Sequence, residues 1–537
     1  MRWRPWFELL PYARRNMRTT SLLFVLSFAC AEAETAPRYA PDGRLLEEST
    51  ELADWNVLFV SIDTLRADHL GCYGYERDTS PRLDALAEGG VVFEKARSAS
   101  PWTTPAHLSL MTSLYPEAHG VYAYPVPGEL DSDVVTLAEA LSAQGWATAG
   151  FTEGGYAKGA TGLDHGFETF PSWPRDEETF VSHELEPSRL EENAERALAW
   201  LGEHATERFF LFFHTYEPHY EYRPPAKYVE ALAPGLFSAE ERASLAAAVE
   251  RWNRGEPLGS ADKGVLTRHY LQGDLFGFEL KRLRKLSKVL ADFREKEWRD
   301  SPGFAEDLAY VTALYDAEIL FTDDVVGRLL DALERHGVLD ETLVVVTSDH
   351  GEGLMDHDEM QHGFHLYEEL LHVPLLLRLP GGAHAGARVS APVRSIDVMP
   401  TVLDVLGLPL PIAAQGTSLL PALEGGGLVA GGFSEALTIQ WGERDLLAYR
   451  RGRWKLVVDV RDGAERLYDL DADPEERRDV LASTDAALVE ELRAELARVL
   501  AENAARGARF TTGEGSFSEA ERQRLEALGY GGHSEDD

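Results

Sequence analysis

Residues 56–62 read NVLFVSI, an apolar run rich in β-branched and aromatic side chains. A continuous run of this kind is typical of a strand that is buried on both faces of a parallel sheet. The run ends at Asp63, so a carboxylate follows the strand directly. The stretch therefore predicts a central strand with a polar group at its carboxyl end.

Further runs of this type alternate with helical patterns along the chain. Strands are predicted at 209–214, 343–347 and 373–379, and helices at 83–88, 137–144, 191–204 and 317–336. Strands that alternate with helices predict an α/β fold with a doubly wound, mostly parallel sheet. Ligands of such sheets bind beyond the carboxyl ends of the strands. Asp63, His214 and Asp349 all fall at such ends.

The composition describes a folded and strongly acidic protein. Of the 537 residues 44% are hydrophobic, and 91 acidic side chains against 52 basic ones give a formal net charge of −39. This charge repels nucleic acid and anionic membranes at long range. We therefore exclude a nucleic-acid partner. An anionic substrate would have to be attracted by a local cluster of metal ions and bases, within a Debye length of about 8 Å.

The first 33 residues have the order of a secretory signal. Scattered arginines precede an apolar run at 21–29, and small residues follow around Ala31 and Ala33. We expect residues 1–33 to direct export, which places the protein in the periplasm or outside the cell. Cys30 follows Leu-Ser-Phe-Ala and is a candidate for lipid attachment, which would anchor the protein in a membrane. Cys72 is the other cysteine, so a lipidated chain has no internal disulfide.

The remaining chain is expected to form one large domain with additions. Residues 34–53 are polar and contain proline, and are interpreted as a linker. The α/β domain is predicted over 54–424. A charged, leucine-bearing helical stretch at about 234–302 is an insertion into it, and forms either a solvated surface element or a lid on the substrate side.

A second, smaller unit is predicted after the glycine-rich stretch at 425–432. Alternating runs at 445–460 and 466–470 are typical of antiparallel strands with one solvated face. We expect a small α+β subdomain over 433–530, followed by a disordered tail at 531–537.

The segment TSDHGE at 347–352 places a carboxylate and an imidazole side by side on a glycine-bearing turn after a strand. One interpretation is a pair that caps the next helix. The other is a metal site, because Asp oxygen and His nitrogen together suit zinc or manganese, whereas oxygen-rich surroundings suit calcium or magnesium.

Seven segments, spread over about residues 54–480, occur in a fixed order. They are NVLFVSIDTLRADHLGCYGY at 56–75, ASPWTTPAHLSLMTSLYPEAHG at 99–120, FFLFFHTYEPHYEYRPP at 209–225, SDHGE at 348–352, LYEELLHVPLLL at 366–377, SIDVMPTVLDVLG at 395–407, and RWKL with LYDLDADPEE near 453–476. In this order they resemble the sulfatase family of the alkaline-phosphatase superfamily. The resemblance implies an alkaline-phosphatase-like fold with a small C-terminal subdomain, and an ester hydrolase.

The resemblance also implies the site residues. Asp63, Asp349 and His350 would be metal ligands, and Thr103 would be a nucleophile that also touches the metal. His214 and His219 fall where the family places residues around the anion or the metal. His362 falls near the position of a family lysine, with His365 as a competitor for that position. Each histidine also has a purely structural interpretation.

Two departures from the family affect the metal site and the support of the nucleophile. The family usually has two adjacent aspartates where this chain has Asp63-Thr64, so one oxygen ligand of a calcium site is missing. It also has an arginine four residues after the nucleophile, where this chain has His107.

The largest departure is Thr103, which stands where the family carries Cys or Ser. Formylglycine is an aldehyde made from a primary thiol or hydroxyl, whereas oxidation of a secondary alcohol gives a ketone, so we expect no formylglycine here. The threonine hydroxyl must then attack sulfur or phosphorus directly. In-line water attack releases a phospho-threonine, whereas the formylglycine route expels sulfate by collapse of its second hydroxyl. The chemistry therefore favours phosphate esters, while the resemblance favours sulfate esters.

The histidines allow a site with two ions about 4 Å apart. His214 or His107 would protonate the leaving group. The cofactor is expected to be zinc, manganese or calcium. One ion would be held by Asp63, Thr103, Asp349 and His350, and the other by some of Glu217, His219 and His362.

Three functions fit these observations. The first is an exported, metal-dependent hydrolase that cleaves a sulfate or phosphate ester of a small molecule, glycan or lipid through Thr103. The second is a transferase that passes a phospho-substituent from lipid to an envelope acceptor. Such transferases usually carry several membrane helices, and the single short apolar segment counts against this class. The third is an inactive sulfatase fold that binds anionic glycans. No motif sets the organic half of the substrate or the oligomeric state.

Overall fold

The computed structural model describes residues 38–39, 45–46, 54–122, 128–171, 173, 189–272, 280–423, 431–438 and 444–510. The predicted signal at 1–33 with Cys30 and the predicted tail at 531–537 lie outside these ranges, as does most of the linker at 34–53. Short strands β1 (Arg38–Tyr39) and β2 (Leu45–Leu46) pair with each other.

The main sheet has seven strands in the order β13-β4-β12-β8-β3-β7-β6. The predicted central strand is β3 (Asn56–Ile62), which is fully buried and pairs in parallel with β7 (Phe209–Thr215) and β8 (Thr342–Thr347). The parallel, α/β character predicted from the sequence is confirmed. The remaining strands are β4 (Val91–Phe93), β6 (Ala147–Phe151), β12 (Leu375–Arg378) and β13 (Ala387–Val389), of which β12 is antiparallel to β8 and β4.

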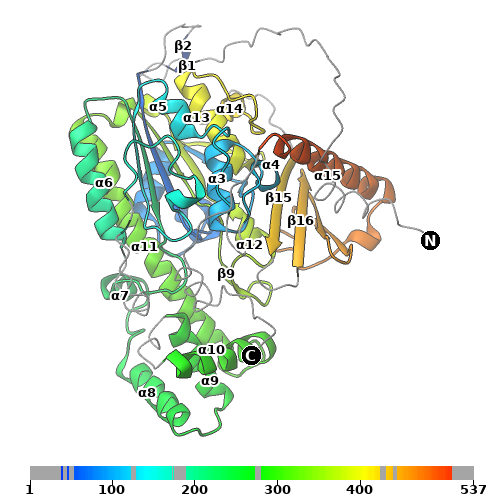
Figure 1. Cartoon of the computed structure of the whole chain (residues 1–537). Coiled ribbons are helices and arrows are strands. Elements are labelled where there is room, and N and C mark those ends of the chain that lie inside the picture. The colour runs from blue at the N-terminus through cyan, green and yellow to red at the C-terminus, as the bar shows by residue number, and fades with distance from the viewer. Residues whose placement is uncertain are drawn as a thin grey trace.

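Helices cover both faces of this sheet (Figure 1). Alternate residues of β3 point to opposite faces: Leu58 and Val60 belong to one apolar cluster, Val57 and Phe59 to the other. The first cluster includes side chains of α2 (Pro81–Glu88), α6 (Leu190–His204) and α11 (Phe304–His336). The second includes side chains of α3 (Thr103–Thr112), α5 (Leu137–Ser142) and α13 (Val398–Leu406).

The strand predicted at 373–379 is two strands, so that prediction was wrong. His372–Val373 forms β11, which pairs with β5 (Ala96–Arg97) in a three-stranded sheet with β14 (Val393–Arg394), whereas β12 starts at Leu375 in the main sheet. Pro374 lies between them and has no N–H to donate to a ladder. Its carbonyl accepts a hydrogen bond from Thr347 Oγ1 at 2.8 Å.

The charged stretch after β7 folds into helices. These are α8 (Ala239–Asn253), α9 (Ser260–Leu271) and α10 (Leu280–Lys296), which lie at the end of α11 away from the bulk of the sheet, whereas α7 (Ala226–Leu232) precedes the insertion (Figure 1). Phe293 of α10 and the nearby Trp298 are fully buried in the same apolar cluster as α11. The insertion is therefore anchored to the main domain by its own core residues.

A four-stranded antiparallel sheet follows. It consists of β15 (Gly431–Thr438), β16 (Arg444–Arg451), β17 (Trp454–Asp459) and β18 (Glu465–Asp469). Leu447 packs with α15 (Ala486–Gly507), whereas Leu446 packs with Leu366, which precedes α12 (Glu368–Leu371), and with Leu371 at the end of that helix. The expected solvated face is thus covered, because the main domain packs against it.

The remaining elements are short, and the surface carries mixed charges. Short elements are α4 (Pro116–His119), α14 (Leu420–Leu423), β9 (Gly353–Leu354) and β10 (Met360–Gln361).

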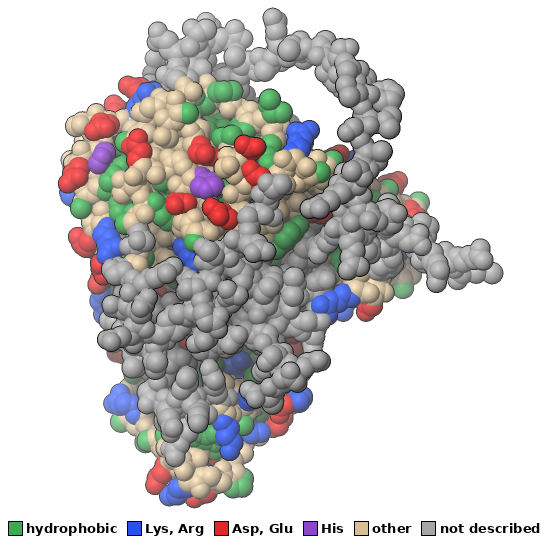
Figure 2. Space-filling model, in the orientation of Figure 1, with side chains coloured by type: hydrophobic (Ala, Val, Ile, Leu, Met, Phe, Trp, Pro, Cys, Tyr) green, Lys and Arg blue, Asp and Glu red, His purple; other side chains and the backbone are tan. Residues whose placement is uncertain are grey.

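None of the helices in the described ranges is long and apolar enough to cross a membrane. On the face shown in Figure 2, Lys and Arg side chains of the described residues are scattered among Asp and Glu and form no continuous basic surface.

Candidate metal centre and active site

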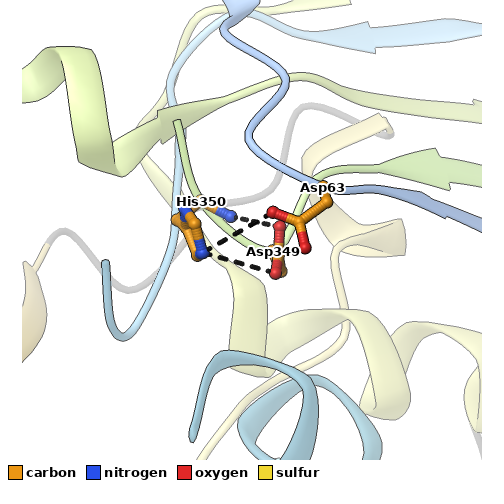
Figure 3. A group of neighbouring side chains, drawn as sticks. All are labelled: Asp63, Asp349 and His350. Atoms are coloured by element: carbon orange, nitrogen blue, oxygen red, sulfur yellow. Dashed lines mark hydrogen bonds and ion pairs between the residues drawn. The ribbon is translucent and has the colours of Figure 1, made fainter. Parts of the chain in front are cut away.

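Three buried side chains meet at the carboxyl ends of β3 and β8. Asp63 directly follows β3, and Asp349 and His350 follow β8, so the parallel pairing of the two strands brings them together (Figure 3). One ligand atom from each lies within 4.8 Å of the others. His350 Nε2 is 3.8 Å from Asp63 Oδ1 and 3.5 Å from Asp349 Oδ2. This is the group that the sequence resemblance implied as metal ligands.

The oxygen atoms of this group have few partners of their own. Three of the four carboxylate oxygens have no hydrogen-bond partner of good geometry among the described residues. They are both oxygens of Asp63 and Oδ2 of Asp349. Burial, with the neighbouring charges of Asp349 and Glu352, raises the pKa of Asp63 well above its usual range. Buried polar atoms without partners are costly, and a divalent cation would offset that cost. The residues present therefore fit a metal.

Backbone contacts orient the other two ligands. His350 Nδ1–H donates to the Gly351 carbonyl at 2.9 Å, which leaves the lone pair of Nε2 directed at the two carboxylates. Asp349 Oδ1 accepts from the backbone N–H groups of His350 and Thr64, at 2.8 and 3.3 Å. Burial lowers the pKa of His350 well below its usual value. A neutral imidazole with a fixed tautomer is the form that binds metals.

Thr103 is the first residue of α3 and is 2% exposed. Its hydroxyl Oγ1 lies 3.4 Å from His350 Nε2, on the same side as the metal group. The free N–H groups and the dipole at the start of a helix favour anions. The hydroxyl of Thr103 therefore lies both at the N-terminus of α3 and next to the candidate cation site.

His107 lies one turn later on α3 and is fully buried. Its Nδ1–H donates to the Thr103 carbonyl at 2.8 Å, and its Nε2 is 2.9 Å from Ser61 Oγ on β3. The same Nδ1 is 3.5 Å from Asp349 Oδ2. His107 thus connects the backbone of Thr103 with a metal-ligand candidate and the central strand.

His214 on β7 is also fully buried and lies near the other oxygen of Asp63. Its Nε2 is 3.8 Å from Asp63 Oδ2, and its ring centroid is 4.4 Å from that of His107. Burial and the neighbouring His107 lower the pKa of His214 well below its usual value. The side chain is therefore neutral and held inside the protein.

His219, His362 and Glu352 form a second polar cluster beside His350. The ring of His362 is 4.5 Å from that of His350 and 4.9 Å from that of His219. His362 Nδ1 is 3.1 Å from Glu352 Oε1, and burial raises the pKa of Glu352 to about 7. His365 instead lies near Glu369 and Tyr367, at 3.7 Å from Glu369 Oε1 and 4.9 Å from the Tyr367 ring. Of the two competing histidines, His362 is therefore the one beside the site.

The residues expected to hold a second ion, Glu217, His219 and His362, do not form a comparable group of ligand atoms among the described residues. Among the residues that the structure describes, Asp63, Asp349 and His350 are the three that bring one ligand atom each within 4.8 Å of one another. Glu217 raises the pKa values of Glu318 and Glu153, after burial as the main cause, so it lies near those carboxyls. The sequence analysis did not predict Glu352 and Ser61 as residues of the site. Glu352 could have been found, because it is the last residue of the SDHGE segment.

Comparisons with known proteins agree with this geometry. The sulfatase family model matches residues 55–408, and the model of the N-sulphoglucosamine sulphohydrolase C-terminal region matches residues 360–503. An N-acetylglucosamine-6-O-sulfatase of Bacteroides thetaiotaomicron is 24% identical over 470 residues, covering 80% of this chain and 83% of the relative. The multifunctional alkaline phosphatase superfamily protein PehA of Trinickia caryophylli is 28% identical, covering 69% of this chain and 77% of the relative.

A solved structure shows the same fold. The phosphonate monoester hydrolase of Agrobacterium radiobacter superimposes with a TM-score of 0.60 at 24% identity, covering 84% of this chain and 96% of that chain.

Proposed function

Because the chain belongs to the sulfatase family of the alkaline phosphatase superfamily, we propose that it is an exported, metal-dependent hydrolase with Thr103 as the nucleophile. Its substrate is a sulfate or phosphate ester. The observation that carries the proposal is the Thr103 hydroxyl, 3.4 Å from His350 Nε2, beside the buried Asp63, whose two oxygens have no hydrogen-bond partner among the described residues.

Asp63, Asp349 and His350 would hold a divalent cation, which when bound stabilises negative charge on the oxygens of the transferring group. One nitrogen and two carboxylate donors suit zinc or manganese. Thr64 stands where a second aspartate would add an oxygen ligand, which weakens the argument for calcium.

The protein's own groups account for positioning and attack. Thr103 Oγ1 gives up its proton to solvent and forms the bond to phosphorus or sulfur as the ester bond breaks, and the leaving oxygen takes up a proton. Attack of water on the same phosphorus or sulfur then breaks its bond to Oγ1, which releases phosphate or sulfate and returns a proton to the Thr103 hydroxyl. His107 holds the Thr103 carbonyl and thereby the nucleophile. The ring of His362 lies 4.5 Å from that of His350, with His219 beside it, and these two side chains would face the anion and the leaving oxygen. His214 buttresses Asp63.

The identity of residue 103 also bears on whether the enzyme uses formylglycine. A secondary alcohol cannot give the formylglycine aldehyde, so we propose that the enzyme works without this modification. The similar proteins include both an N-acetylglucosamine-6-O-sulfatase and a phosphonate monoester hydrolase, so both sulfur and phosphorus esters are tested below. We further propose a catalytic domain over 54–424, a subdomain over 433–530, and export by residues 1–33 with Cys30 as a candidate anchor.

The test is hydrolysis of matched p-nitrophenyl sulfate, phosphate and a phosphodiester, with zinc, manganese or calcium supplied in turn. Wild type and Thr103→Ala are compared on each ester. Cleavage of any ester that Thr103→Ala abolishes supports the proposal and identifies the reacting centre. Full turnover by Thr103→Ala would refute Thr103 as nucleophile. Silence of wild type on all esters would favour a binding function.

A further inference from the structure

The turn that follows Asp63 has a backbone conformation that its sequence does not favour. Thr64 has a φ of 54°, in the left-handed region that β-branched residues rarely adopt. A residue in such a conformation persists only where the surrounding structure holds it. The N–H of Thr64 donates to Asp349 Oδ1 at 3.3 Å. The N–H of Leu65 donates to Ser348 Oγ at 3.0 Å, so the turn joins the carboxyl ends of β3 and β8.

Tyr315 of α11 holds this turn with its hydroxyl group. The O–H donates to the Thr64 carbonyl at 2.7 Å and accepts from the backbone N–H of Arg66 at 3.0 Å. One hydroxyl therefore satisfies a carbonyl and an N–H on the two sides of Leu65. Thr64 and Leu65 are both fully buried. Buried backbone groups without a partner are costly, so these two bonds stabilise the turn as it stands.

The position of the Tyr315 ring is fixed by its neighbours. The side chain is fully buried, and the rings of His69 and Tyr222 lie 5.0 and 5.8 Å from its ring centroid, each at a steep angle. The next residue of α11, Asp316, accepts hydrogen bonds from His69 Nδ1–H and from the Tyr75 hydroxyl, each at 2.8 Å. Two consecutive residues of a long helix therefore bind the chain that follows β3, and the hydroxyl is held at one point.

We propose that Tyr315 is a positioning residue of the metal centre. By holding Thr64 in its left-handed conformation, it keeps the carboxylates of Asp63 and Asp349 beside each other, as Figure 3 shows them. Without the hydroxyl, the Thr64 carbonyl and the Arg66 N–H lose this partner, and the turn relaxes toward the conformations that β-branched residues prefer. The inference rests on the metal site of the proposed function, because Tyr315 acts on the ligands of that same site.

Tyr315→Phe tests the inference, because it removes the hydroxyl and keeps the ring. The Kd for zinc is measured by competition with a chromophoric chelator, at a temperature at which circular dichroism shows each variant to be folded. We expect this Kd to rise about tenfold or more, because loss of a group that orients metal ligands costs about 10–100-fold in affinity. The measurement needs no substrate, so it is independent of ester hydrolysis.

Tyr310→Phe is the matched control on the same helix. Tyr310 is also buried, and its hydroxyl donates to Gln272 Oε1 at 2.6 Å, directly after α9. Loss of this bond should lower thermal stability, as loss of the Tyr315 hydroxyl does, and leave the Kd for zinc unchanged. Similar losses of zinc affinity in Tyr310→Phe and Tyr315→Phe overturn the inference, because a general loss of packing would then explain both.

Thr64→Gly tests whether Tyr315 acts through this turn. Glycine adopts a positive φ without the steric cost that a β-branched residue has, so a turn with glycine depends less on the hydroxyl. In a double-mutant cycle, the loss of zinc affinity caused by Tyr315→Phe should therefore be smaller in Thr64→Gly than in wild type. An equal loss in both backgrounds overturns the inference.

The zinc measurement also separates this inference from the proposed function. If wild type binds zinc and Tyr315→Phe binds it equally well, the metal centre stands and the inference fails. If wild type binds none of zinc, manganese and calcium, the metal-dependent function and the inference both fail. Full ester turnover by Thr103→Ala would refute the nucleophile alone, since the zinc affinities do not depend on it.

Discussion

His107 is fully buried and lies one helical turn after Thr103, at the position where the sequence resemblance implies an arginine. Its ring donates to the Thr103 carbonyl and lies 2.9 Å from Ser61 Oγ. Asp63, Asp349 and His350 could be predicted as a group from strand ends and family motifs. The contacts of His107 and the partnership of His362 with Glu352 could not, because they depend on side-chain packing between segments distant in sequence.

Asp63→Asn should abolish the response to metal without unfolding the protein. Burial raises the pKa of Asp63, so a neutral amide is expected to leave the metal-free protein at least as stable as wild type. At a free zinc concentration one hundred times its Kd, wild type should gain about 2.7 kcal/mol of stability. Calorimetric unfolding with and without zinc measures this gain. Asp340→Asn, at an exposed ion pair with Arg378, should respond like wild type, and so would Asp63→Asn if the metal lay elsewhere.

His107→Gln should lower kcat and leave KM nearly unchanged, because a small displacement of a reacting group can cost on the order of 100-fold in rate. Steady-state kinetics on the best ester measures the effect. His119→Gln is the control, since His119 is also fully buried but contacts Ser109, at 3.2 Å from its Oγ. An equal loss of kcat in both variants would show general destabilisation instead of positioning.

At the scale of elements, the hydrophobic pattern of the sequence predicted the longer, regular helices and strands. The strand at 56–62 and the helices at 83–88 and 191–204 appear at nearly those residues. Two short strands replaced one because Pro374 interrupts the run. The strand at 147–151 received no prediction, because ATAGF contains a glycine and two alanines, which weakly favour strands. Residues 147–151 form a strand because they pair with β7 in the folded protein.

Asp323 of α11 caps α2 and should make stability depend on pH. Its carboxylate accepts from the backbone N–H groups of Arg82 and Leu83 at 2.9 and 2.8 Å, and burial raises its pKa from 3.8 to about 7. The folded state therefore holds a proton that the unfolded state has released between about pH 4 and 7, so stability contributed by this group falls as pH rises through that window.

Urea unfolding of wild type and Asp323→Asn between pH 4 and 8 tests this linkage. Subtraction of the two curves should leave a decrease in the free energy of unfolding up to about pH 7 and a plateau above it. Asp324→Asn is the control, because its side chain is 58% exposed. Parallel curves for wild type and Asp323→Asn would exclude the assignment.

At the scale of the whole molecule, a buried charge network joins the C-terminal sheet to the main domain. Lys455 of β17 is 2% exposed and lies 3.0 Å from Glu368 Oε1 and 2.9 Å from Glu476 Oε1. Arg97 of β5 also binds Glu368. The antiparallel sheet could be predicted from alternation at 445–470, but this interface could not, because charged residues in strands usually indicate solvent.

Lys455→Met should destabilise the protein by about 3–5 kcal/mol, the range for removing one partner of a buried ion pair. Denaturant unfolding measures the change. Arg453→Met is the control on the same strand pair, because Arg453 and Asp469 form a more exposed ion pair, and such pairs contribute little to stability. Similar losses for both variants would show that the network does not hold the two parts together.

The central claim is covalent catalysis by Thr103, and mass analysis of the peptide that contains it tests this claim most directly. The enzyme is mixed with the ester that it cleaves fastest, quenched in acid at short times, and digested. We expect one phosphoryl or sulfuryl group on Thr103 in wild type, no oxidised form of this residue, and neither adduct nor turnover in Thr103→Ala. Turnover by Thr103→Ala, with no group attached to the wild-type peptide at any time, would contradict it.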